Sequence, residues 1–165
     1  MVPSGLADPA FAYAISKADF CPIPRGRSFV SKEEGTELSD VWNGFVDEYI
    51  AQGSDERPRV EIERAAKINT HCGALFRVCE GPSCGKLEGR DVERLSLCSK
   101  CKIAVYCSRT CQAASWKEHK EQCSSGSRVE QMLPSQAAIQ EHVFPALWKD
   151  ALNLTHHVLS KAPEK

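Results

Sequence analysis

Eight side chains that bind soft metal ions crowd into one stretch of the sequence. The chain of 165 residues has nine cysteines, and seven of them lie between positions 79 and 123 together with one histidine. In chain order these side chains are Cys79, Cys84, Cys98, Cys101, Cys107, Cys111, His119 and Cys123. Structural zinc is tetrahedral and prefers thiolate and imidazole ligands, so eight such ligands make two sites. The sequence therefore predicts two structural zinc ions.

The ligands come in four close pairs. Their spacings are Cys-x4-Cys, Cys-x2-Cys, Cys-x3-Cys and His-x3-Cys. A Cys-x2-Cys pair offers two corners of a tetrahedron from a tight turn, whereas residues four apart lie on one face of a helix. Spacing alone leaves two arrangements open. Neighbouring pairs share an ion in a sequential scheme, and alternate pairs share one in an interleaved scheme.

The N-terminal sequence favours metal binding over disulfides. The first twenty residues include Asp8 and have no uninterrupted apolar core followed by small residues, so they do not resemble a signal peptide. No run of about 18 apolar residues occurs, and we expect no membrane span. We therefore expect an intracellular protein, nuclear or cytoplasmic and not secreted, whose thiols stay reduced and able to bind zinc.

The run CSKCKIAVYCSRTCQAASWKEHKEQC, residues 98–123, resembles the second part of a MYND-type zinc finger. Tyr106 precedes a cysteine, Cys-Ser-x-x-Cys-Gln follows it, and Trp116 stands three residues before His119. By position, the resemblance implies the interleaved scheme. It assigns zinc 1 to Cys79, Cys84, Cys107 and Cys111, and zinc 2 to Cys98, Cys101, His119 and Cys123.

The resemblance covers residues 79–123 and implies a small α+β finger with a short hairpin and short helices. One spacing departs from the family pattern. The first pair is Cys-x4-Cys where the family usually has Cys-x2-Cys, and Cys72 is therefore the alternative to Cys79 as the first ligand.

Apolar periodicity predicts helices on both sides of the finger, so we expect a mostly α chain. One set of apolar residues recurs every three or four positions, which indicates a helix of about four turns with a tryptophan in the core. It consists of Leu38, Val41, Trp42, Phe45, Tyr49 and Ile50. Pro58 suits the first turn of a second helix that runs towards Cys72. Further helical patterns start at Pro134 and extend from Leu147 to Val158.

These patterns divide the chain into four predicted parts. Residues 1–35, with many prolines and glycines, are predicted to be an irregular N-terminal segment. Residues 36–76 form a helical flank, 77–124 the zinc finger, and 125–165 a linker with a C-terminal helical segment. We expect the flanking helices to pack on each other and on the finger.

The predicted zinc sites are closed, because protein side chains fill every position and leave none for a catalytic water. We find no paired nucleophile and base, and we predict a recognition module and not an enzyme.

The resemblance implies a protein-interaction module that docks proline-containing peptides, as an adaptor or regulator. By position it assigns the peptide groove to Ser99, Gln112 and Trp116, beside an exposed strand edge around 102–106. The alternative for Trp116 is internal packing against Tyr106 and the second zinc site, and the two roles do not exclude each other.

Two other functions stay open as alternatives. Some MYND fingers are inserted in lysine methyltransferases with a SET domain, but that domain is larger than either flank here, and the flanks hold no Asn-His-Ser segment or Gly-rich cofactor loop. The chain would then be a fragment. A nucleic-acid-binding finger is less favoured, because the net charge is -1 and the thiolates of two zinc sites offset the formal charge of +3 on residues 71–125. We expect a protein partner, with neither nucleic acid nor membrane.

Overall fold

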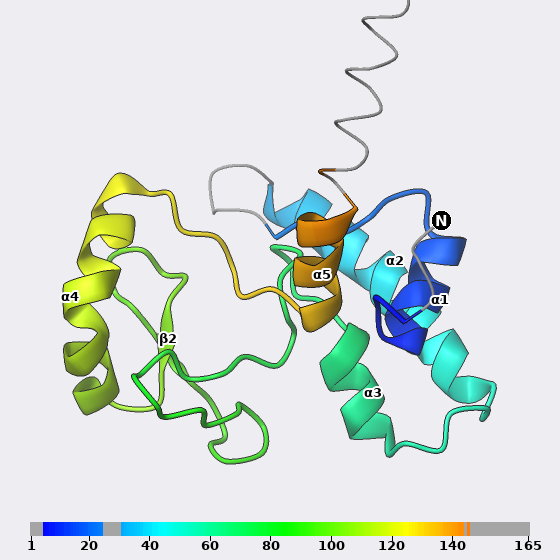
Figure 1. Cartoon of the computed structure of the whole chain (residues 1–165), viewed down its shortest axis with the longest axis horizontal. Helices are drawn as coiled ribbons and strands as arrows, with labels where there is room; N and C mark the ends of the chain where they lie inside the picture. Colours follow the sequence, from blue (N-terminus) through cyan, green and yellow to red (C-terminus); the bar gives the residue numbers. More distant parts are fainter. Residues whose placement is uncertain (1–4, 25–30, 144, 146–165) are drawn as a thin grey trace, which may run out of the picture.

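The computed structural model describes residues 5–24, 31–143 and 145, and its elements form two groups that lie side by side in Figure 1. Four helices pack together and are here called the helical body: α1 (Pro9–Lys17), α2 (Lys32–Ala51), α3 (Arg59–Ala66) and α5 (Pro134–His142). The other group, the finger, contains β1 (Ser96–Leu97), β2 (Val105–Tyr106) and α4 (Arg109–Ser125).

The two strands pair antiparallel, with Leu97 opposite Val105. A small α+β finger with helices before and after it, mostly α overall, is therefore confirmed. No helix in the described ranges combines the length and the apolar composition needed to cross a bilayer.

Helix α1 lies inside the segment predicted to be irregular, and that prediction is wrong for residues 9–17. The prediction took Pro9 as a helix breaker, although proline is favourable in the first turn of a helix. Asp8 caps the helix by accepting a hydrogen bond from Ala10 N at 2.9 Å. Phe11 and Ala14 are fully buried. Capping and apolar burial together therefore form a helix where composition suggested a loop.

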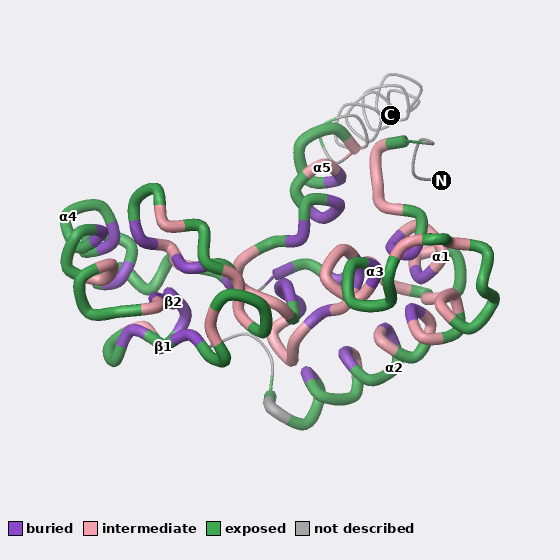
Figure 2. Tube along the Cα trace, turned by 90° about the horizontal axis from the view of Figure 1, so that it is seen from below, coloured by how far each residue is buried: buried purple, intermediate pink, exposed green. Residues whose placement is uncertain are grey.

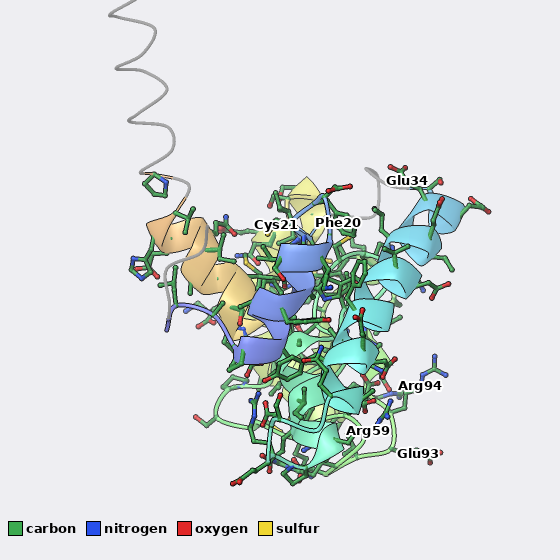
Figure 3. The ribbon with its side chains drawn as sticks, turned by 90° about the vertical axis from the view of Figure 1, so that its right-hand side faces the viewer. Phe20, Cys21, Glu34, Arg59, Glu93 and Arg94 are labelled. Carbon is green, nitrogen blue, oxygen red and sulfur yellow. The ribbon has the colours of Figure 1, made fainter. Side chains whose placement is uncertain are left out.

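Trp42 is at the centre of the helical body. Its side chain is 0% exposed, its ring lies 4.8 Å from that of Phe11 and 6.0 Å from that of Phe20, and its Nε1 donates to Ala66 O at 2.8 Å. Buried residues recur along one side of α2 in Figure 2, and Trp42 is the one among them that belongs to the predicted apolar stripe. Val41 is 46% exposed, but the rest of the stripe packs partly buried against the same core, which confirms it there: Leu38, Phe45, Tyr49 and Ile50. Figure 3 looks onto these helices, with Phe20 just beyond the end of α1.

The second predicted helix is shorter than expected, since α3 ends at Ala66 and does not run towards Cys72. The side chain of Asn43 binds the backbone just beyond this end. Its Oδ1 accepts from Ile68 N and its Nδ2 donates to Ile68 O, both at 2.9 Å. A helix would need these same backbone groups for its own hydrogen bonds, so the pairing with Asn43 competes with helix continuation. The chain then turns through Cys72, whose φ is 62°.

Residues 128–133, here called the strap, run back from the finger to the helical body (Figure 1). Gln131 O accepts from Ala74 N at 2.7 Å. The Gln131 side chain accepts from Val78 N at 2.8 Å and donates to Val78 O at 2.6 Å. Arg128 forms an ion pair with Glu80. The chain segments that enter and leave the finger are therefore tied to each other.

Helix α5 follows the strap and begins at Pro134, as predicted. Gln136 fixes it to the helical body, because its Nε2 donates to Cys72 O at 2.6 Å and to Pro22 O at 2.9 Å. The predicted apolar face from Leu147 to Val158 lies outside the described residues. The division of the chain into four parts stays a prediction.

A glycine substitution tests the packing of the strap. A Cβ on Gly73 would lie 2.5 Å from Glu130 Cβ and 2.8 Å from Gln131 O. We expect Gly73→Ala to reduce the free energy of unfolding by about 1–3 kcal/mol, because the strap must shift. Gly44→Ala is the matched control, since a Cβ there meets nothing within 4 Å in the exposed middle of α2, and this change should be neutral or stabilising by up to about 1 kcal/mol. Urea titrations of both variants measure the difference, and equal stabilities would contradict the packing described.

Candidate metal centres

The structure brings the eight predicted ligands together in two groups of four. Within each group the ligand atoms all lie within 4.8 Å of one another. The first cluster is Cys79, Cys84, Cys107 and Cys111, and the second cluster is Cys98, Cys101, His119 and Cys123. Alternate pairs thus share a cluster, which is the interleaved arrangement.

The first cluster is built from the chain that enters the finger and from the start of α4. Cys84 ends a tight turn in which its N–H donates to Gly81 O at 3.1 Å. Cys111 sits in the first turn of α4, where Ser108 Oγ caps the helix by accepting from Cys111 N at 3.2 Å. A Cβ at position 81 would lie 2.6 Å from Cys111 Cβ, so glycine is needed there for the turn to approach the helix.

The second cluster joins the hairpin turn to the middle and end of α4. Cys98 N donates to Ala104 O at 2.8 Å, and Lys102, with φ 57°, closes the turn by donating its N–H to Cys98 O at 2.9 Å. His119 and Cys123 are four residues apart on α4 and both are buried. Since α4 carries ligands of both clusters, neither cluster can form without positioning this helix.

The distances between ligand atoms fit tetrahedral zinc. Zn–S bonds of about 2.3 Å place two sulfurs about 3.8 Å apart, and a Zn–N bond of about 2.0 Å places nitrogen and sulfur about 3.5 Å apart. Cys107 Sγ lies 3.6 Å from both Cys84 Sγ and Cys111 Sγ. In the second cluster, Cys98 Sγ lies 3.9 Å from Cys123 Sγ and 3.4 Å from His119 Nε2. Both clusters therefore fit a structural zinc ion with four protein ligands, and the metal supplies cross-linking and not a reactive site.

Within each cluster the surroundings lower the pKa of one thiol and raise that of another. A hydrogen bond with Cys111 is the main cause that raises the pKa of the Cys107 thiol to about 12, and burial raises the pKa of the Cys123 thiol. A hydrogen bond from the backbone N–H of Lys86 is the main cause that lowers the pKa of the Cys84 thiol to about 7. Burial raises the pKa of the Cys98 thiol, but hydrogen bonds from the Cys101 backbone and the His119 ring outweigh it and lower this pKa to about 6. Each cluster thus has a thiol that ionises close to neutral pH, which favours metal uptake.

His119 uses its Nε2 for the cluster, and the residue also lines a polar hollow. Its Nδ1 is buried and has no hydrogen-bond partner among the described residues. The hollow has a volume of about 310 Å³. Its lining consists of Glu80, Tyr106, Ser115, Glu118, His119, Gln122 and Arg128. A histidine that binds zinc through Nε2 keeps its proton on Nδ1.

The two cysteines outside the clusters belong to the helical body. Cys72 is 2% exposed and packs in the core that contains Trp42. Burial raises the pKa of the Cys21 thiol. Cys79, and not Cys72, completes the first cluster. The unusual Cys-x4-Cys spacing is accommodated because Ser83 adopts a φ of 55° in the turn before Cys84.

The residues expected to form a peptide groove are all at the finger surface, but only two share an element. Gln112 and Trp116 lie one turn apart on α4, whereas Ser99 is exposed in the hairpin turn. Trp116 is 41% exposed and its ring lies 5.9 Å from that of His119. The ring packed inside is that of Tyr106, which is 2% exposed. Trp116 therefore packs against His119 of the second cluster and is also partly exposed, and its assignment to a peptide groove stays a prediction.

The strand edge expected to be open around 102–106 is occupied at Val105. Val105 O accepts from Glu80 N at 2.9 Å, and residues 103–106 are all buried. Glu80 O in turn accepts from Ser115 Oγ of α4 at 2.6 Å. Sequence reasoning missed Glu80 and Ser115, because a backbone contact between distant segments leaves no local pattern. The cap at Ser108 could have been found, since serine is a favoured N-cap residue at a predicted helix start.

Removal of metal is expected to unfold the finger. Zinc contributes folding free energy on the order of 10 kcal/mol per structural site. Native mass spectrometry should find two zinc ions on the folded chain and none after denaturation, and excess chelator should reduce the helical circular dichroism signal. One ion or none on the folded chain, or a spectrum insensitive to chelator, would contradict the two-site arrangement.

Two cysteine variants test the first ligand. Cys79→Ala should leave the chain with one zinc, because the first cluster would keep only three ligands. Cys72→Ala, at a cysteine equally buried but in the helical body, should keep two. Zinc-to-protein ratios measured on the folded variants decide between them, and the reverse result would make Cys72 the ligand.

The comparisons with known proteins agree with this geometry. The family model described as "MYND finger" matches residues 79–123. The chain is 41% identical over 70 residues to a SET and MYND domain-containing protein of Dictyostelium discoideum. This match covers 41% of this chain and 13% of that protein. It is 50% identical over 36 residues to the histone-lysine N-methyltransferase SMYD1 of Homo sapiens. This match covers 22% of this chain and 7% of that protein.

An F-box protein of Arabidopsis thaliana is 43% identical over 57 residues, which covers 34% of this chain and 15% of that protein. The chain thus spans only a small part of the length of these relatives. No solved structure matches it significantly. The agreement of motif, ligand geometry and family model identifies residues 79–123 as a MYND-type zinc finger.

Proposed function

We propose that this chain uses its MYND finger to dock proline-containing peptides of partner proteins, as an adaptor or regulator. One observation carries the proposal. Trp116 is 41% exposed on α4, whereas Tyr106, the other aromatic ring between residues 79 and 123, is 2% exposed. An exposed tryptophan on a folded surface is a typical anchor of protein interfaces. MYND fingers are protein-interaction modules, so the anchor and the family point to the same class of partner.

The surroundings of Trp116 suit a preformed docking surface. The ring rests on His119, and His119 and Cys123 hold this part of α4 in the second cluster. Little conformational entropy is then lost when a ligand binds. A flat indole complements the flat ring of proline, and a proline-rich peptide is already extended before it binds.

Gln112 stands one turn before Trp116, where its side-chain amide can bond a peptide backbone group. Ser99 offers a hydroxyl from the hairpin turn. Because the backbone edge at Val105 is occupied by Glu80, the proposal places the peptide across α4 and the hairpin turn, and not as an added strand on β2.

The proposal includes an intracellular location, in the nucleus or the cytoplasm. Both clusters need reduced thiols to bind zinc, and reducing compartments keep thiols available.

A part in protein-lysine methylation is the second candidate. It is favoured by the names of the relatives, several of which are histone-lysine N-methyltransferases. The matches cover 7% and 11% of those two proteins, so the likeness extends to a small part of each. A transfer assay with labelled S-adenosylmethionine and a lysine-containing protein substrate tests it, and turnover by this chain would favour the methyltransferase over the interaction module.

Replacement of the tryptophan tests the docking proposal. Trp116→Ala should weaken binding of a fluorescent peptide with a proline–leucine core by about thirtyfold, since truncation of a tryptophan anchor costs about 2 kcal/mol or more. Val60→Ala is the matched control, because Val60 is also 41% exposed but lies on α3. Fluorescence anisotropy gives the affinities and zinc content checks the fold. Equal affinities of the two variants would contradict a docking site at Trp116.

A further inference from the structure

The charged residues on the side of α4 that carries Trp116 are cations. Positions 112, 116, 120 and 124 recur at steps of four and so line one side of the helix. Arg109 is two turns before Trp116 and lies on the same side. Both charged residues at these five positions, Arg109 and Lys120, are cations. Both are exposed.

The hairpin turn adds two more cations to this side. Lys100 Nζ donates to Ser124 Oγ at 3.0 Å, which places the turn against the side of α4 that bears Trp116. Lys100 and Lys102 are exposed in this turn, next to Ser99. Four exposed cations therefore lie on the side of α4 that bears the tryptophan or in the hairpin turn next to it, and they are here called the basic rim: Lys100, Lys102, Arg109 and Lys120.

The carboxylates of the finger near α4 lie elsewhere. Glu118 and Glu121 are two and five positions from Trp116, which places them about 160° and 140° around the helix from it. Glu118 lines the polar hollow together with Glu80, and Glu80 is paired with Arg128.

None of the four rim cations forms an ion pair among the described residues, whereas seven other lysine or arginine residues do. These seven are Lys17, Arg57, Arg59, Lys67, Arg77, Arg90 and Arg128. The rim cations are therefore available to a partner, as are the exposed Lys86 and Lys117 of the finger outside the rim.

We propose that the surface formed by Trp116 and the basic rim selects proline-containing peptides that carry aspartate or glutamate beside the proline. This inference rests on the proposed docking function and names its partner more closely. Carboxylates of the peptide would contact the cations at the edge of the docking surface, which favours acidic peptides and disfavours basic ones.

The charges favour a short acidic peptide over nucleic acid. A zinc ion with four thiolates has a formal charge of -2, and one with three thiolates and a neutral histidine has -1. These charges lie in the same small finger and nearly cancel the charge of the rim at long range. Four cations can still contact a few carboxylates, but a nucleic acid backbone is bound by a longer row of basic residues and by a positive field that extends from the surface.

The experiment compares two fluorescent peptides on the zinc-loaded full chain. Both have the same proline–leucine core, flanked in one by aspartate and glutamate and in the other by asparagine and glutamine. We expect the acidic peptide to bind at least about threefold more tightly, since exposed ion pairs contribute up to about 1 kcal/mol each. Raising the salt concentration from about 50 mM to about 500 mM should remove most of the difference.

A charge-matched pair of double variants locates the effect. Lys100→Gln with Lys120→Gln should abolish the preference for the acidic peptide and keep the affinity for the neutral one. Lys86→Gln with Lys117→Gln removes the same charge from the finger outside the rim, and should keep the preference. Loss of the preference in both double variants would show a general effect of net charge and overturn the assignment to the rim.

The remaining outcomes separate this inference from the function on which it rests. If the wild-type chain binds both peptides equally, the inference is overturned and the docking function stands. If neither peptide binds, both are overturned. If a single-stranded oligonucleotide displaces the acidic peptide at about 150 mM salt, the basic rim serves nucleic acid and the proposal of a peptide partner is wrong.

Discussion

Tetrahedral coordination by ligands that alternate along the chain is the constraint on which the finger depends. The hairpin and the chain before it supply half of the ligands, and the segment from Cys107 through α4 supplies the rest, so each cluster joins parts distant in sequence. Helix α4 shows why metal is needed. Its buried side chains are Ser115, His119 and Cys123, and none is a large apolar group. An isolated helix of this kind is marginal in water. Coordination, and not apolar burial, holds α4 against the hairpin.

The effect of this constraint extends beyond the finger. The end of α4 leads directly to the strap, whose Gln131 pairs with the backbone of Val78 just before the first ligand. The strap then leads to α5, which is fixed to the helical body through Gln136. The core around Trp42 has the apolar side chains to support the helical body by itself. The strap therefore connects a part stabilised by apolar burial to a part stabilised by metal, and it limits how Trp116 is oriented relative to the helices.

The sequence predicted the features that repeat at short range. Ligand pairs at steps of three to five, the apolar stripe around Trp42 and the start of α5 at Pro134 all have local patterns, and the structure contains them. The prediction failed where one side chain or backbone group acts on a distant segment. Asn43 ends α3 by binding Ile68, and Glu80 occupies the strand edge at Val105. Helix α1 was missed because Pro9 was taken as a breaker in a segment where burial of Phe11 decides the structure. Which ligand pairs share an ion followed from the family resemblance and not from spacing.

The proposed function uses the outer side of α4, which is available to a partner when both metal clusters are closed. It therefore depends on which ligand pairs bind the same metal ion. NMR of the protein with ¹¹³Cd in place of zinc measures this sharing directly, through couplings between each metal and the protons of its ligands. One cadmium signal should correlate with Cys79, Cys84, Cys107 and Cys111, and a second with Cys98, Cys101, His119 and Cys123. A signal that correlates with Cys84 and Cys98 together would show a sequential arrangement and contradict the interleaved one.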